Sequence, residues 1–411
     1  MHAYETHVPT NEKMKILVLT SCYLPAIGGA ETGLFELYRL LSMKHEVLMV
    51  TRHMESGESM EGELDPYYHC DRIHVKRYPR IEPKEWARSL RWLPGVPMFA
   101  LAAGFYGMRF QPDLIHLHFI STCIGAWSVL RHISSAPMVV SLVGRADVLD
   151  AANPYYASRR EAIERALGQA ARVVHLTDYM VGDRRKDPRY VRIPYGVNFV
   201  VPTAAEVDGF RARMGISPGQ QVLLCLARFE NRTKRQNLLV SALGPLLRKR
   251  PNTVLLLVGE GPDREALAAQ VRREGLADQV LTPGFILEKD IPACLYSGTV
   301  FVFAALAETF GIVLAQAMAA GLPIVAMNCS CIGEVVRHGE CGRIVPDQDQ
   351  EAMRTAVEEL LDDETLRRNM GERGRERART EFGWDSIATR HDLLFQEVVA
   401  VANYRRWEKT S

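Results

Sequence analysis

The sequence predicts an α/β protein built from two doubly wound, Rossmann-like domains, and three observations support this. Short apolar and β-branched runs alternate with longer helical stretches, a pattern typical of βα units on a parallel sheet. The alternation pauses over residues 193–202 and then starts afresh. A length of 411 residues suits two or three domains. We expect an N-terminal domain over residues 13–200, a C-terminal domain over 201–382, and a helical tail over 383–411 that packs back towards the first domain.

The first half contains five strand candidates. The run KILVLT at residues 15–20 is largely apolar, which indicates a strand buried on both faces. A Gly-containing loop and a helix near residues 31–43 follow it. The other strands are expected at residues 46–51, 113–117, 138–142 and 172–176.

The second half repeats the pattern. Strands are expected at residues 221–226, 253–258, 280–282, 299–303 and 324–327, and helices at 236–249, 263–274 and 291–296. A further helix begins near Phe310 or Gly311 and ends before Gly321 and Pro323, because Gly just past a helix and Pro shortly after it stop the helix. The chain from residue 351 onward is helical and rich in Arg, and we expect those Arg residues to lie on solvated faces.

Composition disfavours several classes of function. The chain has 50 Lys and Arg against 49 Asp and Glu, a formal charge of +1, so a general nucleic-acid-binding surface is not expected. Eight Cys are too dilute for a disulfide scaffold and lie mostly in apolar runs, which suits a reducing cytoplasm. Cys329, Cys331 and Cys341 lack the C-x-x-C pairs and His partners of a zinc site, so no metal is expected.

No segment has the features of a signal peptide or a membrane span. Residues 1–12 are polar, and the longest uncharged run, residues 93–108, is shorter than the roughly 20 apolar residues that a spanning helix needs. Its basic flanks, which include Arg88 and Arg109, would suit contact with lipid headgroups. A buried helix with basic ends is the simpler interpretation. We expect a cytoplasmic protein, with peripheral contact at the inner face of a membrane as an alternative.

The most informative segment is Glu308-Thr-Phe-Gly-Ile-Val-Leu-Ala-Gln316, just after the strand expected at residues 299–303. Ligands of doubly wound sheets bind beyond the carboxyl ends of the strands, and two facing halves imply a site in a cleft between them. The first amides of the helix near Gly311 can hold an anion, and a glycine there lets the backbone approach a phosphate. The Glu308 carboxylate and the Gln316 amide could each bind hydroxyls of a polyol.

A second segment places two cations at the carboxyl end of another strand. Arg228 and Lys234 follow the strand expected at residues 221–226 and face the same cleft in this interpretation. Charge-assisted hydrogen bonds contribute on the order of 1.5–3 kcal/mol each, so the two side chains could anchor a pyrophosphate and stabilise it as a leaving group.

The third segment, Pro25-Ala-Ile-Gly28-Gly29-Ala-Glu31, follows the first strand. It is not G-x-G-x-x-G, and no acidic residue ends the strand at residues 46–51, so a dinucleotide site and an NAD-dependent oxidoreductase are disfavoured. A Gly-Gly turn that opens a helix suits close approach to a phosphate, although a simple packing turn would look the same.

Together these segments resemble the retaining, nucleotide-sugar-dependent glycosyltransferases of family four, which have the GT-B architecture of two Rossmann-like domains facing across a cleft. The resemblance is strongest over residues 221–346, where the E-x7-E motif of the family corresponds to Glu308 through Gln316. It implies that Glu308 binds sugar hydroxyls and that Arg228 and Lys234 hold the donor diphosphate, these three being the catalytic candidates. The donor-binding residues implied by the resemblance are Gly28, Gly29, Gly259, Gly284, Phe285, Ile286, Glu308, Phe310, Gly311, Ile312, Val313 and Gln316.

Three positions depart from the family pattern. Gln316 replaces the second Glu, so a ribose contact there loses charge assistance. The catalytic-loop H-G-x-D appears as VGRAD at residues 143–147, and the N-G-V-D of the domain junction appears as YGVN at residues 195–198. On the acceptor side the candidates are His118, for which a structural role is the alternative, Gly144 and Asp147.

The resemblance implies transfer of a hexose-type sugar from a nucleotide-diphosphate sugar to a saccharide, lipid-linked or small-molecule hydroxyl. It implies front-face substitution with retention, and no cofactor or metal, because Arg228, Lys234 and the helix N-terminus supply positive potential. Two alternatives stay open, a GT-B nucleotide-sugar epimerase or hydrolase, and a non-catalytic nucleotide-sugar-binding subunit. The sequence does not indicate the donor base and sugar, the acceptor, or the oligomeric state.

Overall fold

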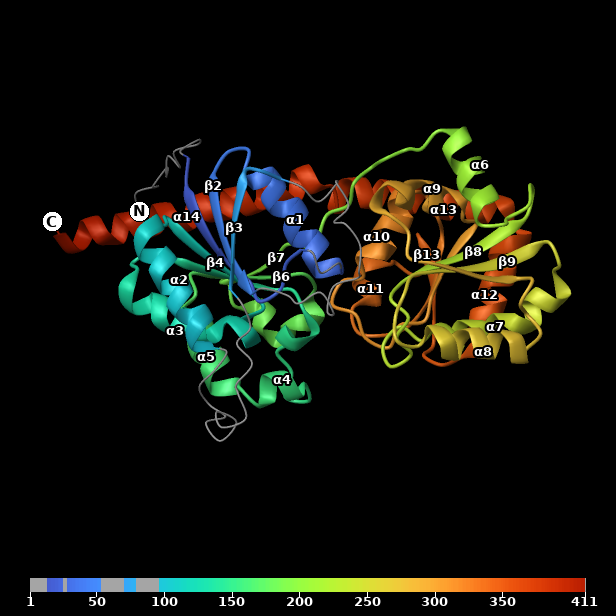
Figure 1. The fold of residues 1–411 in the computed structure, drawn as a ribbon, viewed down its shortest axis with the longest axis horizontal. Coiled ribbons are helices and arrows are strands. Elements are labelled where there is room, and N and C mark those ends of the chain that lie inside the picture. The colour runs from blue at the N-terminus through green and yellow to red at the C-terminus, as the bar shows by residue number, and fades with distance from the viewer. Residues whose placement is uncertain (1–12, 25–27, 53–69, 79–95, 411) are drawn as a thin grey trace. The chain divides into compact units, whose positions relative to one another are not determined.

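The computed structural model describes residues 13–24, 28–52, 70–78 and 96–410, and the chain divides into two compact units (Figure 1). Unit 1 comprises Met1–Pro194 together with Trp384–Ser411, and unit 2 comprises Tyr195–Gly383. Each unit has its own parallel sheet with helices on both faces, which confirms the prediction of two doubly wound, Rossmann-like halves.

The sheet of unit 1 has the strand order β3-β2-β1-β4-β5-β6-β7, all parallel. Its strands are β1 (Lys15–Leu19), β2 (Glu46–Arg52), β3 (Ile73–Tyr78), β4 (Leu114–His118), β5 (Met138–Leu142), β6 (Arg172–His175) and β7 (Tyr190–Arg192). In β1, Ile16 pairs with Val47 on one side and Leu114 on the other. Its side chain is fully buried, as an apolar run flanked by strands and covered by helices requires. The edge strands β3 and β7 were not among the predicted strands.

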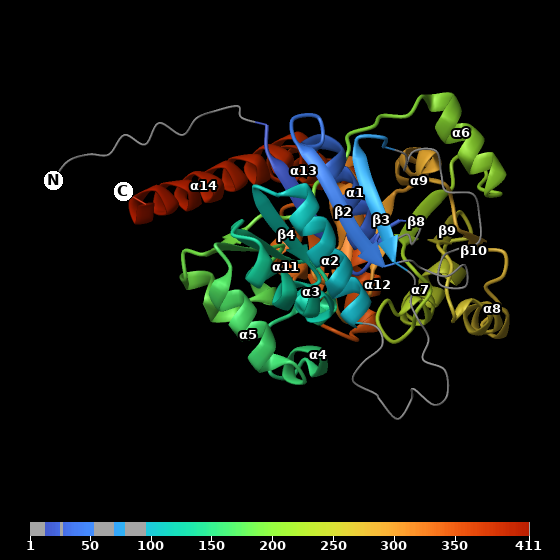
Figure 2. The ribbon, with the colours of Figure 1, turned by 60° about the vertical axis from the view of Figure 1, so that its left-hand side comes forward.

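Helices cover both faces of this sheet (Figure 2). One face carries α1 (Gly29–Leu41) and α14 (Trp384–Thr410), which pack against each other. The other face carries α2 (Val96–Phe110), α3 (Ile120–Ile133) and α5 (Arg160–Gln169), and the short α4 (Pro154–Ala157) precedes α5. The C-terminal helix is held by the ion pair of Asp392 with Lys44 and its hydrogen bond to His45, and by the packing of Phe395 on His116.

Unit 2 repeats the doubly wound order as β10-β9-β8-β11-β12-β13, again all parallel. Its strands are β8 (Gln221–Leu226), β9 (Thr253–Val258), β10 (Val280–Gly284), β11 (Val300–Phe303), β12 (Ile324–Met327) and β13 (Gly342–Val345). One face carries α7 (Gln236–Lys249), α8 (Arg264–Arg273) and α12 (Gln350–Asp362), and the other carries α6 (Ala204–Arg213), α9 (Ile291–Ser297), α10 (Ile312–Ala319) and α13 (Glu364–Glu381). The short α11 (Ile332–Val335) precedes β13.

Helix α10 ends as the sequence predicts, but it begins later. Gly321 adopts φ +79°, and the Leu322 amide donates to the carbonyl of Ala317, so the helix stops in a Schellman motif. At its start, Gly311 is the N-cap with φ +77°, a left-handed conformation, so the first helical residue is Ile312 rather than Phe310 or Gly311.

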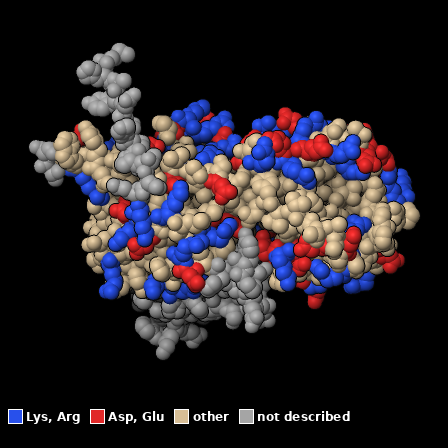
Figure 3. Space-filling view, turned by 90° about the horizontal axis from the view of Figure 1, so that it is seen from above, with Lys and Arg blue, Asp and Glu red and all other residues tan. Residues whose placement is uncertain are grey.

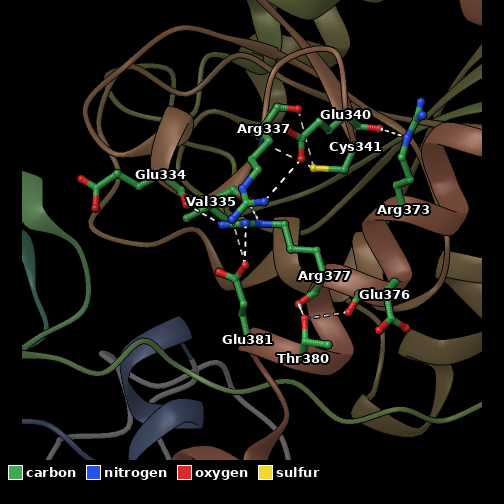
Figure 4. A network of polar contacts seen from close by, with 10 residues as sticks. All are labelled: Glu334, Val335, Arg337, Glu340, Cys341, Arg373, Glu376, Arg377, Thr380 and Glu381. Atoms are coloured by element: carbon green, nitrogen blue, oxygen red, sulfur yellow. Dashed lines mark hydrogen bonds and ion pairs between the residues drawn. The ribbon is translucent and has the colours of Figure 1, made fainter.

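The Arg-rich helix α13 is not simply a solvated face, which corrects the prediction. The Arg377 side chain is 9% exposed and donates to the carbonyls of Val335 at 3.1 Å and Glu334 at 2.9 Å (Figure 4). It also pairs with Glu381 at 2.7 Å. Because a guanidinium has five N–H donors, it can stay charged inside the unit while it caps the end of α11. The position of Arg377 in a charged run of the sequence did not indicate that it caps α11.

Helix α2 also differs from the simpler prediction of a buried helix. Ala103 is fully buried, but Leu101, Phe105 and Met108 are 62%, 54% and 56% exposed. Residues 93–95 of the predicted run lie outside the described residues, and so does Arg88 in its flank. Among the described helices, none is long and apolar enough to cross a membrane.

Candidate functional site

The topology of unit 2 places two loops side by side at the point where the strand order reverses. β8 and β11 are neighbours in the sheet, while the chain after β8 winds to β9 on one side and the chain after β11 winds to β12 on the other. The loops that leave their carboxyl ends, residues 227–235 and 304–311, therefore flank the topological switch point, where open α/β sheets bind ligands. Every catalytic candidate lies in these loops.

The loop over residues 227–235 is held by backbone hydrogen bonds to the turn Gly259-Glu-Gly-Pro262 after β9. The amide of Phe229 donates to the carbonyl of Glu260 at 2.9 Å, and that of Asp263 donates to the carbonyl of Phe229 at 3.2 Å. A Cβ at Gly259 would lie 2.1 Å from the carbonyl oxygen of Ala227, so only glycine permits this approach. The assigned donor-binding residue Gly259 therefore shapes the loop by allowing close backbone contact.

The structure brings two of the predicted catalytic residues into direct contact. Lys234 Nζ forms an ion pair with Glu308 Oε1, with the side chains 25% and 12% exposed. Lys234 Nζ also lies 5.9 Å from the centre of the Phe303 ring. The Glu308 amide donates to the Ser330 hydroxyl at 2.9 Å. An ion pair that is partly shielded from water thus joins the two loops that flank the switch point.

Arg228 lies on the same loop and is exposed. Within the described residues its guanidinium makes no hydrogen bond or ion pair, so the structure does not join it to Lys234 or Glu308. A free guanidinium at a strand's carboxyl end is able to meet an anion, because both of its planar N–H pairs remain available.

The segment after Glu308 contains a buried side chain, Phe310, and then the N-terminus of α10. Phe310 is 2% exposed and packs edge-on against Phe382, so its side chain belongs to the core of unit 2. The N-cap Gly311 offers no side-chain hydrogen bond, and the first amides of an α-helix, here those of Ile312 and Val313, have no acceptor inside the helix. Gln316 is half-buried on the same helix.

Gly284, Phe285 and Ile286, three of the donor-binding residues implied by the resemblance, lie at the end of β10 and directly after it. Gly284 has φ +94°, and a Cβ there would lie 2.6 Å from the Glu260 carboxylate, which is paired with Arg264. Phe285 is 42% exposed and Ile286 is half-buried. An exposed aromatic ring beside a backbone that only glycine can adopt is suited to contact with a flat ring system.

Sequence reasoning did not single out Arg235, although it follows Lys234 directly. Its Nε donates to the carbonyl of Ala304 at 2.7 Å, and its Nη2 pairs with Asp347 at 2.5 Å. This hydrogen bond from Arg235 is the main reason that the pKa of Asp347 is lowered. The only signal in the sequence was that Arg235 follows another basic residue, Lys234. Neighbouring basic residues are too common in proteins to indicate a functional position.

Some of the predicted residues of unit 1 lie at its own switch point, between β1 and β4. Gly28 and Gly29 follow β1 and His118 ends β4, whereas Gly144 and Asp147 follow β5. Gly28 is the N-cap of α1, with extended φ of −161°, and Gly29 is the first residue of that helix. Residues 25–27 of the Gly-Gly loop lie outside the described residues. The assigned role of this loop over a phosphate stays a prediction.

Asp147 closes a tight turn inside unit 1. Its buried carboxylate accepts hydrogen bonds from the amides of Val143 at 3.2 Å and Gly144 at 3.1 Å. Burial raises the pKa of Asp147 to about 6, against the opposing effect of these amides. The carboxylate thus stabilises its own turn, and the acceptor-side roles of Gly144 and Asp147 stay predictions.

His118 ends β4 and is 1% exposed. The Tyr38 hydroxyl lies 2.7 Å from Nε2 of His118 and 2.7 Å from Nδ1 of His116, and Nε2 of His116 lies 2.7 Å from the Ser141 hydroxyl. Burial is the first cause of the lowered pKa of both histidines, to about 3 for His118. These geometries fit neutral, structural histidines, although Nδ1 of His118 has no hydrogen-bond partner within the described residues.

No group of three or more His, Cys, Asp or Glu side chains that could hold a metal ion is found in the described part of the chain. The eight cysteines are free thiols. On the face drawn in Figure 3, Lys and Arg residues are interspersed with Asp and Glu.

Two family models match the chain, one on each unit. Glycosyl transferases group 1 matches residues 207–377, which contain both loops of the switch point. The Glycosyl transferase 4-like domain matches residues 28–196. Both matches agree with the motif-based resemblance.

Curated relatives include enzymes named for the synthesis or transfer of sugar conjugates. The chain is 24% identical to an N-acetyl-alpha-D-glucosaminyl L-malate synthase of Bacillus anthracis, over 94% of this chain and 98% of the relative. It is 31% identical to a GDP-mannose-dependent alpha-(1-6)-phosphatidylinositol monomannoside mannosyltransferase of Mycobacterium tuberculosis. That second match covers 64% of this chain and 63% of the relative, slightly less than two thirds of its length.

Solved structures of GT-B glycosyltransferases have the same fold. HepE of Anabaena, solved in complex with UDP and glucose, aligns with a TM-score of 0.76 at 19% identity over 93% of this chain and 100% of that chain. Sucrose-phosphate synthase of Thermosynechococcus elongatus aligns with a TM-score of 0.77 at 23% identity over 95% of this chain and 100% of that chain. The predicted GT-B fold class is thereby confirmed.

Proposed function

This chain belongs to the group 1 glycosyltransferases with a family-four-type N-terminal domain, and from that premise we propose that unit 2 binds a nucleotide-diphosphate sugar and that the enzyme transfers the sugar with retention. The observation that carries the proposal is the Lys234–Glu308 ion pair at the switch point between β8 and β11. A cation and a carboxylate held together there match the two halves of such a donor, a charged diphosphate and a hydroxyl-rich sugar.

The diphosphate has three sources of positive potential in unit 2. Lys234 supplies a point charge, and Arg228 supplies a guanidinium whose N–H groups have no partner among the described residues. The first turn of α10 contributes amides whose helix dipole favours an anion. When the diphosphate arrives, Lys234 exchanges part of its contact with Glu308 for a phosphate oxygen. The Glu308 carboxylate is then free to accept hydrogen bonds from sugar hydroxyls.

The reaction that we propose is a front-face substitution. The bond between the anomeric carbon and the diphosphate oxygen breaks, the acceptor oxygen forms a bond to the same face of that carbon, and the acceptor proton passes to the departing phosphate. Groups that are already in place meet the charge that develops on the phosphate, which is the largest contribution a protein commonly makes to such a step. No metal is required by this scheme, because Lys234 and Arg228 neutralise the leaving group.

We propose a saccharide, lipid-linked or small-molecule hydroxyl as the acceptor, bound by unit 1, and a location on the cytoplasmic side. The B. anthracis relative is named for a small-molecule acceptor and the M. tuberculosis relative for a phosphatidylinositol mannoside, so both chemistries occur among similar proteins. Neither comparison supports an epimerase, a hydrolase or a non-catalytic subunit.

The test is product analysis with UDP-, GDP- and ADP-linked glucose, N-acetylglucosamine and mannose, each offered with mixed sugar and lipid acceptors. We expect release of one nucleoside diphosphate that requires an acceptor, and a product whose anomeric proton coupling shows the configuration of the donor. Inversion at the anomeric carbon would contradict the front-face route. Acceptor-independent release as the only activity would instead identify a hydrolase.

A further inference from the structure

Arg235 keeps a backbone conformation that most residues avoid. It is the N-cap of α7 with φ +54° and ψ +46°, in the left-handed region where an L-residue is strained and glycine is not. Such strain persists only where the surrounding structure holds it, and it gathers at functional sites. The side chain of Arg235 makes contacts that glycine could not make, and these contacts explain why an arginine stands at this position.

The Arg235 side chain spans the carboxyl edge of the sheet of unit 2. Its Nε donates to the carbonyl of Ala304 at 2.7 Å, directly after β11, and its Nη2 donates to the carbonyl of Ala305 at 3.4 Å. The same Nη2 pairs with Asp347, two residues after β13. The side chain is 11% exposed, whereas Arg228 is exposed and its guanidinium has no partner among the described residues. Arg235 is therefore used inside unit 2, and Arg228 is the one available to a ligand.

Two ties join the loop after β8 to the segment that leads into Glu308. The Arg235 guanidinium holds the backbone at the end of β11, four residues before Glu308. On the other side of Lys234, the carbonyl of Thr233 accepts a hydrogen bond from the amide of Leu306 at 2.8 Å. Lys234 thus lies between two residues that are both bound to the opposite loop.

Strained backbone gathers around this edge of the sheet. Five residues other than glycine have positive φ in the part of the chain that the structure describes, and three of them lie in loops after strands of unit 2. Besides Arg235 these are Ser330, after β12 with φ +34°, and Gln348, after β13 with φ +62°. The Ser330 hydroxyl accepts a hydrogen bond from the Glu308 amide at 2.9 Å, and Gln348 directly follows Asp347. The three strained positions therefore adjoin the partners of the ion pair and of Arg235.

We propose that Arg235 is a positioning residue, which fixes the distance between Lys234 and Glu308. Its guanidinium joins the loop after β8 to the ends of β11 and β13, so loss of this side chain lets the loop shift and carries Lys234 away from the donor diphosphate. A misplacement of about 1 Å can reduce a rate on the order of 100-fold. The proposal rests on the proposed function of the ion pair.

The first test compares Arg235→Ala with Arg343→Ala, which removes another ion pair of unit 2, the one with Glu359. With the donor that product analysis selects, Arg235→Ala should lower kcat about tenfold or more and change KM by no more than about twofold, whereas Arg343→Ala leaves both unchanged. In a Lys234→Ala background the loss of kcat caused by Arg235→Ala should shrink to about twofold or less, because the cation that Arg235 positions is absent.

Asp347→Ala separates positioning from direct contact of Arg235 with the diphosphate. If Arg235 acts through its ties to the protein, Asp347→Ala should lower kcat about fivefold, and the double variant with Arg235→Ala should be no slower than Arg235→Ala alone. If Arg235 binds the phosphate instead, Asp347→Ala frees its guanidinium for that contact, and kcat keeps its value or rises.

Arg235→Gly keeps the test independent of folding. Glycine adopts the left-handed backbone without strain, so Arg235→Gly should unfold at a higher urea concentration than Arg235→Ala, as measured by circular dichroism. Its kcat should stay as low as that of Arg235→Ala, because neither variant has a side chain that ties the two loops. A residue needed only for folding would regain kcat together with stability.

Four results would overturn the proposal. They are equal kcat for Arg235→Ala and Arg343→Ala, an undiminished effect of Arg235→Ala in the Lys234→Ala background, full kcat in Asp347→Ala, and recovery of kcat in Arg235→Gly. Each is distinguishable from failure of the proposed function, which would appear as full activity of Lys234→Ala in the same assay.

Discussion

The two units share a doubly wound topology but place their polar side chains in opposite ways. In unit 1 polar groups lie inside the sheet itself, with His116 and His118 on β4 and Ser141 on β5, all nearly inaccessible to water. In unit 2 the strands β8 and β11 are apolar, and the charged pair Lys234 and Glu308 stands beyond their ends. We therefore expect stability in acid to depend mainly on unit 1, and we propose that unit 2 carries the donor chemistry.

The largest expected effect is selective loss of unit 1 in acid. Burial is the first cause of the lowered pKa values of His116, His118 (about 3) and His391 (about 4). Unfolded histidine binds a proton near pH 6.5, so the stability of unit 1 is fully present above that pH and falls as pH drops from 6.5 towards 4. Each group contributes up to roughly 1.4 kcal/mol per pH unit.

The two units can be followed separately because all five Trp residues, at positions 86, 92, 127, 384 and 407, belong to unit 1. Urea unfolding at pH 7.5 and pH 5 is monitored by tryptophan fluorescence and by circular dichroism. We expect the fluorescence midpoint to fall at pH 5 while a second transition, seen only by circular dichroism, moves less. If both urea midpoints fall equally at pH 5, the expected difference in acid stability between the two units is wrong.

The second effect concerns the charged pair of unit 2. Lys234→Ala should reduce kcat about 100-fold, equivalent to roughly 2.7 kcal/mol, because the leaving diphosphate loses its nearest point charge. Lys249→Ala, which removes an exposed Lys at the end of α7, is the control and should keep full activity. Steady-state kinetics decides the matter, and an unimpaired Lys234→Ala enzyme would refute the assigned role.

A smaller effect is expected at Gln316. Gln316→Glu restores the carboxylate of the family motif on a half-buried position of α10. A charge-assisted hydrogen bond to a ribose hydroxyl should lower KM for the donor by up to about tenfold with kcat little changed. If KM rises instead, the residue does not contact the ribose.

Asp147 gives a test of opposite sign within unit 1. Its pKa is raised to about 6, so the folded state binds more protons than the unfolded state between about pH 4 and 6. Ionised Asp147 therefore costs stability above pH 6, and the cost disappears as pH falls. Asp147→Asn can keep the hydrogen bonds to Val143 and Gly144 and should change stability at pH 7.5 by only about 1 kcal/mol, measured by urea unfolding. A large loss would show that the charge itself holds the turn.

The fold was largely predictable and the contacts were not. The strand at residues 221–226 and the helix at 236–249 match β8 and α7 residue for residue, because apolar runs and helical periodicity are local properties. The edge strands β3 and β7 are more polar and were missed. At the site, the sequence identified Lys234 and Glu308 by motif, but their ion pair depends on the parallel neighbours β8 and β11.

Arg235 and Arg377 show the limit of sequence reasoning most clearly. Both lie in charged runs that suggest a solvated surface, yet one clamps the end of β11 and the other caps α11 from a buried position. For His118 the position at a strand end left a site role and a structural role both open. The structure adds what the sequence could not show, a contact of Nε2 with the hydroxyl of Tyr38, 80 residues earlier in the chain.

The central claim is that positive groups of unit 2 grip the diphosphate of a sugar donor, and nucleotide binding tests it most directly. Thermal unfolding is measured with UDP, GDP and ADP for the unchanged chain, Lys234→Ala and Lys249→Ala. We predict that one nucleotide at 100 times its Kd stabilises the unchanged chain and Lys249→Ala by about 2.7 kcal/mol, and that at the same concentration Lys234→Ala loses most of this gain. Equal stabilisation of all three proteins, or none by any nucleoside diphosphate, would contradict it.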